Sequence, residues 1–285
     1  MTSTRAIVAL AKGVSKKMLI KRLLTAVILV PLIIMAVLKL DSSEFLFVMM
    51  PVLVISSWEY SSLIKMGSWL AKALYVSALI GAAYFLNQTP FLLMPLLIVT
   101  LLWWVINSFW IISFPRHTHY WNNYLATRLV NGFFFFVPLL ISLSALHQID
   151  STLVLLLLAL VWAADSGAYF VGRAIGKNKL LPSVSPGKTI EGAAGGALFS
   201  LGVMFIYVRF GFENATFEQY FFYGILSLVV TLTSILGDLF ESLQKRIAGV
   251  KDSGILLPGH GGLFDRIDSL TASAPIFFLA YGFLT

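Results

Sequence analysis

Nine stretches of mainly apolar residues, separated by short polar segments, follow one another along this chain. Each stretch is long enough to cross a membrane as an α-helix, or nearly so, because a crossing takes about 20 residues. The pattern predicts an all-α, polytopic integral membrane protein with about nine transmembrane helices. The predicted spans are 23–40, 45–64, 69–87, 91–112, 129–147, 152–172, 190–210, 220–241 and 266–285.

The composition supports this fold class. Apolar residues make up 59% of the chain and charged residues only 12%, whereas a soluble domain carries about 25% charged residues. The mean hydropathy is +0.89. Cysteine is absent, which excludes disulfides, thiolate metal ligands and cysteine nucleophiles.

The basic residues indicate topology rather than a nucleic-acid partner, although the net charge is +7. If nine spans begin with a cytosolic N-terminus, 18 of the 20 Lys and Arg residues fall on the cytosolic side, and only Lys39 and Arg209 fall outside. This positive-inside bias predicts a multi-pass protein of the cell membrane, in bacteria the inner membrane. We expect no nucleic-acid partner.

Carboxylates gather near the cytosolic ends of the last spans. Asp265 and Asp268 are three residues apart and share a helix face, as do Asp238 and Glu241. Counting about 1.5 Å per residue places both pairs at one level, with Asp165 roughly 10 Å deeper. Carboxylates from two helices at one depth suit a hard divalent cation, with Asp238 and Asp265 as the main ligands. The alternative is that these acids form structural ion pairs with Lys245, Arg246 and Arg266.

Two loops have the composition of a phosphate site. Segment 173–188 is basic and leads through Ser185, Gly187 and Lys188 into a helix, an arrangement suited to anions. It is not a P-loop, because Pro182 stands where glycine is needed; a basic loop that only sets topology is the alternative. The loop 245–264 holds Gly261 and Gly262, which let the backbone approach a ligand closely.

Three other features have simpler explanations. Gly192 and Gly196 form a small-xxx-small pair that predicts close helix packing. His117 and His119 lie with Trp121 in a cytosolic loop, where an interfacial anchor fits better than a metal site. His260 could contact a phosphate or transfer a proton, or could be an interfacial histidine.

The C-terminal motif is similar to the signature of phosphatidate cytidylyltransferases, also called CDP-diacylglycerol synthases. The similar positions are Ser242, Lys245-Arg246, Lys251-Asp252, Gly254, Pro258, His260-Gly261-Gly262, Asp265-Arg266 and Asp268. Gln244 departs from the family pattern, which usually has an apolar residue there. The resemblance covers at least residues 160–275, so we expect 1–150 to be scaffold helices and 151–285 to be the catalytic region.

The resemblance implies a nucleotidyltransferase that converts CTP and phosphatidic acid to CDP-diacylglycerol and pyrophosphate for phospholipid synthesis. It also implies Mg²⁺, a cytosolic active site and a homodimer. Asp238 and Asp265 would hold the metal, supported by Asp268 and Glu241, and His260 would belong to the catalytic set. Lys188, Lys245, Arg246, Lys251 and Arg266 would neutralise phosphates. Asp165 would complete the acidic cavity, and Ser185, Gly187, Gly261 and Gly262 would approach the phosphates.

Two alternatives remain at this stage. A cation-coupled transporter also uses acids within interrupted helices, but its site lies at the midplane of the membrane, and uptake without nucleotide would reveal it. Another CTP-dependent lipid enzyme, such as a polyprenol kinase, would release CDP and a phospholipid instead of pyrophosphate and a CDP-lipid.

Overall fold

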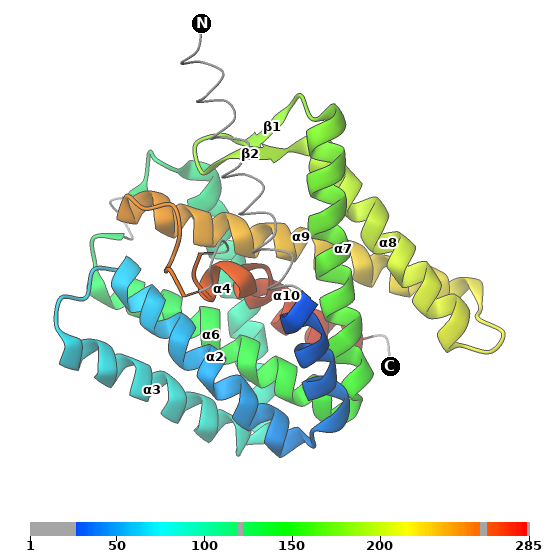
Figure 1. Ribbon diagram of the computed structural model, residues 1–285, viewed down its shortest axis with the longest axis horizontal. Coiled ribbons are helices and arrows are strands. Elements are labelled where there is room, and N and C mark those ends of the chain that lie inside the picture. Colours follow the sequence, from blue (N-terminus) through cyan, green and yellow to red (C-terminus); the bar gives the residue numbers. More distant parts are fainter. Residues whose placement is uncertain (1–26, 119–121, 257–260, 284–285) are drawn as a thin grey trace, which may run out of the picture.

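The computed structural model describes residues 27–118, 122–256 and 261–283, and helices make up most of it (Figure 1). Helix Val27–Lys39 comes first. It is followed by α2 (Ser42–Leu63), α3 (Trp69–Asn87), the short 3₁₀ helix η1 (Pro90–Leu92), α4 (Leu93–Ser113), α6 (Leu125–Ile149), α7 (Ser151–Ile175), β1 (Lys179–Leu181), β2 (Ser185–Thr189), α8 (Ile190–Gly211), α9 (Phe217–Ala248) and α10 (Phe264–Gly282).

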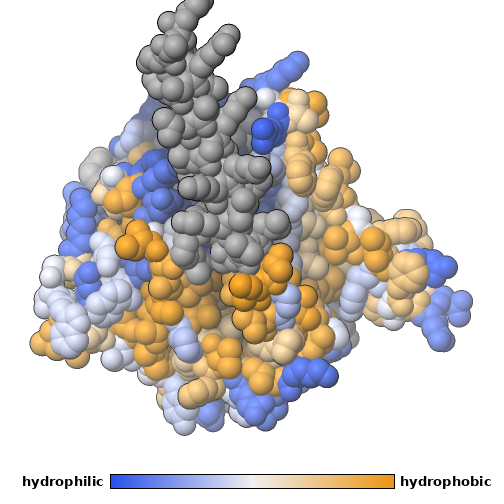
Figure 2. Space-filling view, in the orientation of Figure 1, coloured by the Kyte–Doolittle hydropathy of each residue, from blue (hydrophilic) through white to orange (hydrophobic). Residues whose placement is uncertain are grey.

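Each predicted span coincides with a helix in the described part of the chain. Seven segments are long and apolar enough to cross a membrane. Helix Val27–Lys39 and α10 match the first and last predicted spans. On the face shown in Figure 2, hydrophobic side chains gather over the middle of the molecule and hydrophilic ones toward its upper and lower edges. The all-α, polytopic fold class is therefore confirmed.

One predicted loop contains a small β-hairpin. Strands β1 and β2 pair antiparallel, with Lys179 opposite Thr189 and Leu181 opposite Ser185. The side chain of Thr189 then accepts a hydrogen bond from Gly192 N at 3.1 Å and caps the start of α8. The hairpin stands at the end of α7 (Figure 1), and its second strand leads directly into α8, so the segment 185–189 lies beside two helices.

Helix α9 continues seven residues beyond the end of the predicted span, to Ala248. Hydropathy could not show this, because the added residues 242–248 include Gln244, Lys245 and Arg246. The helix ends where Gly249 takes a left-handed conformation with φ of 77°, which glycine adopts readily.

Helices α7 and α8 pack closely along a line of glycines, which confirms the predicted packing role of Gly192 and Gly196. A Cβ atom on Gly192 would lie 2.9 Å from Ala168 O, and one on Gly196 would lie 2.7 Å from Ala164 O. A Cβ atom on Gly167 of α7 would likewise lie 2.6 Å from Gly195 O. Small residues therefore set the distance between the two helices.

We expect Gly196→Ala to destabilise the protein by about 1–3 kcal/mol, because the methyl group would force the two helices apart. Gly202→Ala on the same helix is the matched control, since a Cβ there meets nothing within 4 Å. Thermal unfolding in detergent should give a lower midpoint for Gly196→Ala and an equal or higher one for Gly202→Ala. Equal midpoints for the two variants would contradict this account of the packing between α7 and α8.

An aromatic cluster joins the start of α10 to the N-terminal helices. The ring of Phe264 packs against Tyr60 of α2 at 5.9 Å and against Phe135 of α6 at 5.1 Å between centroids. All three side chains are fully buried. The first turn of α10, which carries two of the predicted site residues, is therefore packed against residues from the first half of the chain.

Candidate active site

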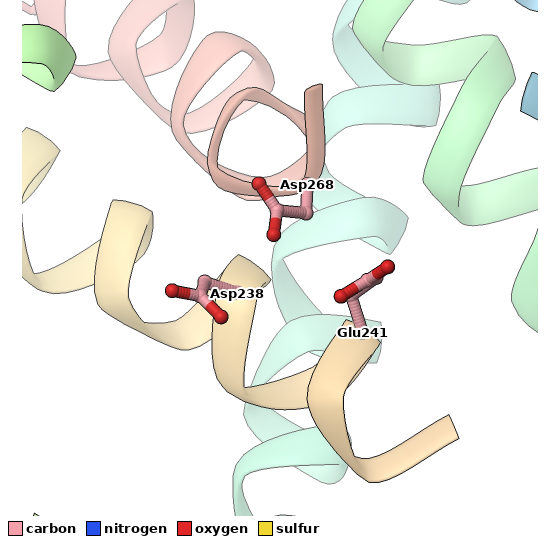
Figure 3. Close-up of side chains that lie close together, drawn as sticks. All are labelled: Asp238, Glu241 and Asp268. Atoms are coloured by element: carbon pink, nitrogen blue, oxygen red, sulfur yellow. The ribbon is translucent and has the colours of Figure 1, made fainter. Parts of the chain in front are cut away.

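Three carboxylates from two helices lie close together (Figure 3). They are Asp238 and Glu241 of α9 and Asp268 of α10, and one oxygen from each lies within 4.8 Å of the others. We call these residues the acidic trio. Gly237 allows this approach, because a Cβ there would collide with the backbone oxygen of Asp268.

The acidic trio has the donors that a divalent metal needs. Ligand oxygens at about 2.1 Å from one Mg²⁺ lie at most about 4.2 Å apart, close to the spacing in the structure. Glu241 is fully buried, and its Oε1 atom has no hydrogen-bond partner among the described residues. A buried oxygen without a partner is costly unless a ligand satisfies it, so the trio fits a hard cation.

Lys245 neutralises part of this negative charge. Its ammonium group contacts the Glu241 carboxylate, one helical turn away, and lies 2.6 Å from Asp265 Oδ1. The structural ion pairs considered as an alternative therefore exist for Glu241 and Asp265. Oε1 of Glu241 still has no hydrogen-bond partner among the described residues, so pairing with Lys245 and binding a cation are compatible.

Asp265 is not a member of the trio but borders it, because it shares Lys245 with Glu241, and it organises the loop before α10. Its Oδ2 atom accepts hydrogen bonds from Gly262 N at 2.8 Å, Ser253 N at 2.9 Å and Ser253 Oγ at 3.0 Å. Gly261 makes the turn with φ of 82°. Free backbone donors at a helix start attract a carboxylate, so Asp265 turns to the loop while Asp268 faces α9.

The hairpin brings a lysine to the open side of the trio. Lys188 of β2 lies 2.7 Å from Asp238 Oδ2. Arg246 of α9 donates from Nε to the carbonyl oxygen of Val184 at 3.2 Å and ties the hairpin turn to the helix. Lys188, one of the five cations predicted to contact phosphate, thus lies beside a carboxylate, and Arg246 holds the hairpin that carries it.

Comparison with known proteins identifies the family of the chain. A model of the cytidylyltransferase family matches residues 20–284. The chain belongs to the cytidylyltransferase family. It is 35% identical over 288 residues to the phosphatidate cytidylyltransferase of Haemophilus influenzae, covering 94% of this chain and 100% of that relative. It is also 35% identical over 262 residues to that of Pseudomonas aeruginosa, covering 91% and 96%.

The other residues predicted to belong to the site differ in their surroundings. Asp165 of α7 lies within electrostatic range of Asp238, Lys188 and Arg266. Arg266 and Lys251 are exposed, as is Gly187, while Ser185 is half-buried. His260, together with His119 and Trp121, lies outside the described residues.

One residue near this site was not predicted. Glu59 of α2 interrupts an otherwise apolar run, and its carboxylate accepts hydrogen bonds from the backbone of Leu263 and Phe264 at the start of α10. The only signal in the sequence was a single acid within a predicted span. Its partners lie about 200 positions away, with separations of 204 and 205, so spacing could not reveal them.

Proposed function

We propose that this protein transfers the cytidylyl group of CTP to phosphatidic acid and releases CDP-diacylglycerol and pyrophosphate. The acidic trio next to Lys188, at the meeting of α9, α10 and the hairpin, is the observation that carries the proposal. Membership of the cytidylyltransferase family and the names of its relatives give the direction of the chemistry.

The reaction joins a phosphate oxygen of phosphatidic acid to the α-phosphorus of CTP while the bond to the pyrophosphate oxygen breaks. A phosphate monoester is already an adequate nucleophile, so a serine or cysteine nucleophile is not needed. The protein must align the two substrates and neutralise their charge, which is how most enzymatic phosphoryl chemistry is accelerated.

We propose that Asp238, Glu241 and Asp268 hold Mg²⁺. When bound, the ion would neutralise phosphate charge and polarise the phosphorus centre. Asp265, grouped with these acids on sequence grounds, would act through Lys245 and through the turn at Gly261 and Gly262. It would thereby keep a cation and free backbone donors at the mouth of the site.

The cations would bind the substrates' phosphates. Lys188 already contacts Asp238 and is only partly exposed, so it can pass from a carboxylate to a phosphate with a small movement. We assign the same role to Lys245, Arg246, Lys251 and Arg266, with Ser185, Gly187 and His260 as further contacts from the motif and Asp165 at the acidic floor.

We further propose that the site faces the cytosol of a bacterial inner membrane and that residues 1–150 mainly support 151–285. The positive-inside count favours this orientation. Every member of the trio, Lys188 and Lys245 come from the second part of the chain. The homodimer implied by the family resemblance is part of the proposal and can be tested by the mass of the detergent-solubilised protein.

Product analysis tests the proposed function. The purified protein is incubated with α-labelled CTP and phosphatidic acid, with and without Mg²⁺. We expect a labelled CDP-lipid and one pyrophosphate per turnover, both dependent on the metal. Labelled CDP with transfer of a single phosphate would overturn the proposal in favour of a lipid kinase, and the absence of any nucleotide product would overturn it altogether.

A further inference from the structure

Glu59 is a buried carboxylate that reaches the active-site loop from the opposite half of the chain. It lies near the end of α2 and is 9% exposed. Its Oε1 accepts from Leu263 N at 3.1 Å, and its Oε2 accepts from Phe264 N at 2.9 Å and from Ser253 Oγ at 3.3 Å. Its oxygens thus accept three hydrogen bonds within two short segments.

These bonds cap the N-terminus of α10, which has no side-chain cap from its own segment. The residue at the cap position is Leu263, and no side chain of its own segment caps the helix. The first N–H groups of a helix need acceptors and attract negative charge. Glu59 supplies both from another helix, so the place where α10 begins depends on α2.

The loop around Glu59 is shaped to admit this carboxylate. A Cβ on Gly254 would collide with Glu59 Oε1, and a Cβ on Gly262 would lie 2.5 Å from Glu59 Oε2. Both glycines belong to the C-terminal motif, so their close approach to Glu59 gives them a specific role. Glu59 is therefore built into the loop.

Ser253 connects Glu59 to the site. Its hydroxyl group lies 3.3 Å from Glu59 Oε2 and 3.0 Å from Asp265 Oδ2, and Asp265 in turn contacts Lys245. Asp268 follows Asp265 by three residues on the same helix, so any movement of the first turn of α10 also moves Asp268 relative to α9.

We propose that Glu59 is a positioning residue for the proposed cytidylyl transfer. By capping α10 from α2 it fixes the turn at Gly261 and Gly262, the Asp265–Lys245 pair and the distance of Asp268 from Asp238 and Glu241. The inference rests on the proposed function, although the geometry it describes does not.

Three variants separate this role from a contribution to stability alone. Glu59→Ala removes every acceptor. Glu59→Gln keeps the shape but offers one acceptor oxygen, and its NH₂ group faces a backbone donor. Glu218→Gln is the matched control, because Glu218 is an exposed glutamate in the first turn of α9, twenty residues before Asp238.

For folded protein we expect kcat to fall by about tenfold or more in Glu59→Ala, since misplacement by about 1 Å can cost 100-fold. Glu59→Gln should lie between Glu59→Ala and wild type. The Mg²⁺ concentration for half-maximal rate should rise in the same order, and Glu218→Gln should match wild type. A residue that only stabilises the fold would lower the folded yield without changing either quantity.

A distance measurement without substrate completes the test. The chain has no cysteine, so spin labels can be attached at Ile255→Cys in the loop and at Leu232→Cys on α9. Ile255 is 96% exposed and Leu232 is 67% exposed. We expect a broader or shifted distance distribution in Glu59→Ala and a partly restored one in Glu59→Gln.

The outcomes are separable. Wild-type kcat in folded Glu59→Ala would overturn the proposal, as would an unchanged distance distribution. If Glu59→Ala does not fold, the same two criteria apply to Glu59→Gln. Inactivity of the wild-type protein with CTP and phosphatidic acid would refute the proposed function instead, and the distance distributions would still test whether Glu59 holds the loop.

Discussion

Asp268→Asn is expected to lower the rate of CDP-lipid formation at least about 100-fold, because metal charge stabilisation is worth several kcal/mol and each 1.36 kcal/mol is a factor of ten. The amide cannot provide the negative charge that completes the acidic trio. The measurement is the initial rate per folded protein across a range of Mg²⁺ concentrations, where raised metal should recover only part of the rate.

Asp150→Asn is the control for this variant. Asp150 caps α7 by accepting a hydrogen bond from Thr152 N at 2.8 Å, and asparagine caps helices equally well. It should keep the wild-type rate and metal dependence. A rate for Asp268→Asn close to wild type, in protein that is folded, would remove Asp268 from the proposed metal site.

Asp265→Asn provides an informative comparison. Sequence alone predicts loss of turnover without loss of membrane insertion, with Asp265 as a metal ligand. The structure places its carboxylate against Lys245 and the loop N–H groups. We therefore expect Asp265→Asn to lower the rate with less change in metal dependence than Asp268→Asn.

Lys245→Met is expected to lower the free energy of unfolding by about 3–5 kcal/mol, the cost of leaving a buried charge without its partner. The ammonium group lies between Glu241 and Asp265, and its side chain is only 13% exposed. Denaturant unfolding in detergent measures the effect, and Lys179→Met, an exposed lysine in β1, is the control.

A double variant identifies the cause. Adding Glu241→Gln to Lys245→Met removes the carboxylate that the lysine compensates, so part of the lost stability should return. Double-mutant cycles detect such coupling between residues in contact. Strictly additive effects would show that Lys245 stabilises the protein through something other than this ion pair.

The membrane helices could be predicted because each corresponds to a long apolar run in the sequence. The ends of the helices could not. Helix α9 continues through Lys245 and Arg246 after the apolar run has ended at Glu241, since Lys245 pairs with Glu241 and with Asp265 of α10. The hairpin 179–189 was missed because its strands are three and five residues long.

The sequence predicted which residues gather at the candidate site, but not which carboxylates contact one another. Spacing puts Asp265 and Asp268 on one helix face, but Asp265 lies in the first turn, where unpaired N–H groups of the loop compete for its carboxylate. Asp238, Glu241 and Asp268 converge because Gly237 lets two backbones meet, which only a structure reveals. The contacts of Glu59 with the start of α10 are likewise visible only in the structure.

The ion pair within α9 bears on how the protein is made. Glu241 and Lys245 are one turn apart on the same helix, so they can neutralise each other as soon as that helix forms, before Asp268 has been synthesised. A lone carboxylate would oppose entry into lipid by about 2.5–3.5 kcal/mol or more. Pairing with Lys245 would therefore lower the cost of inserting α9 before α10 is made.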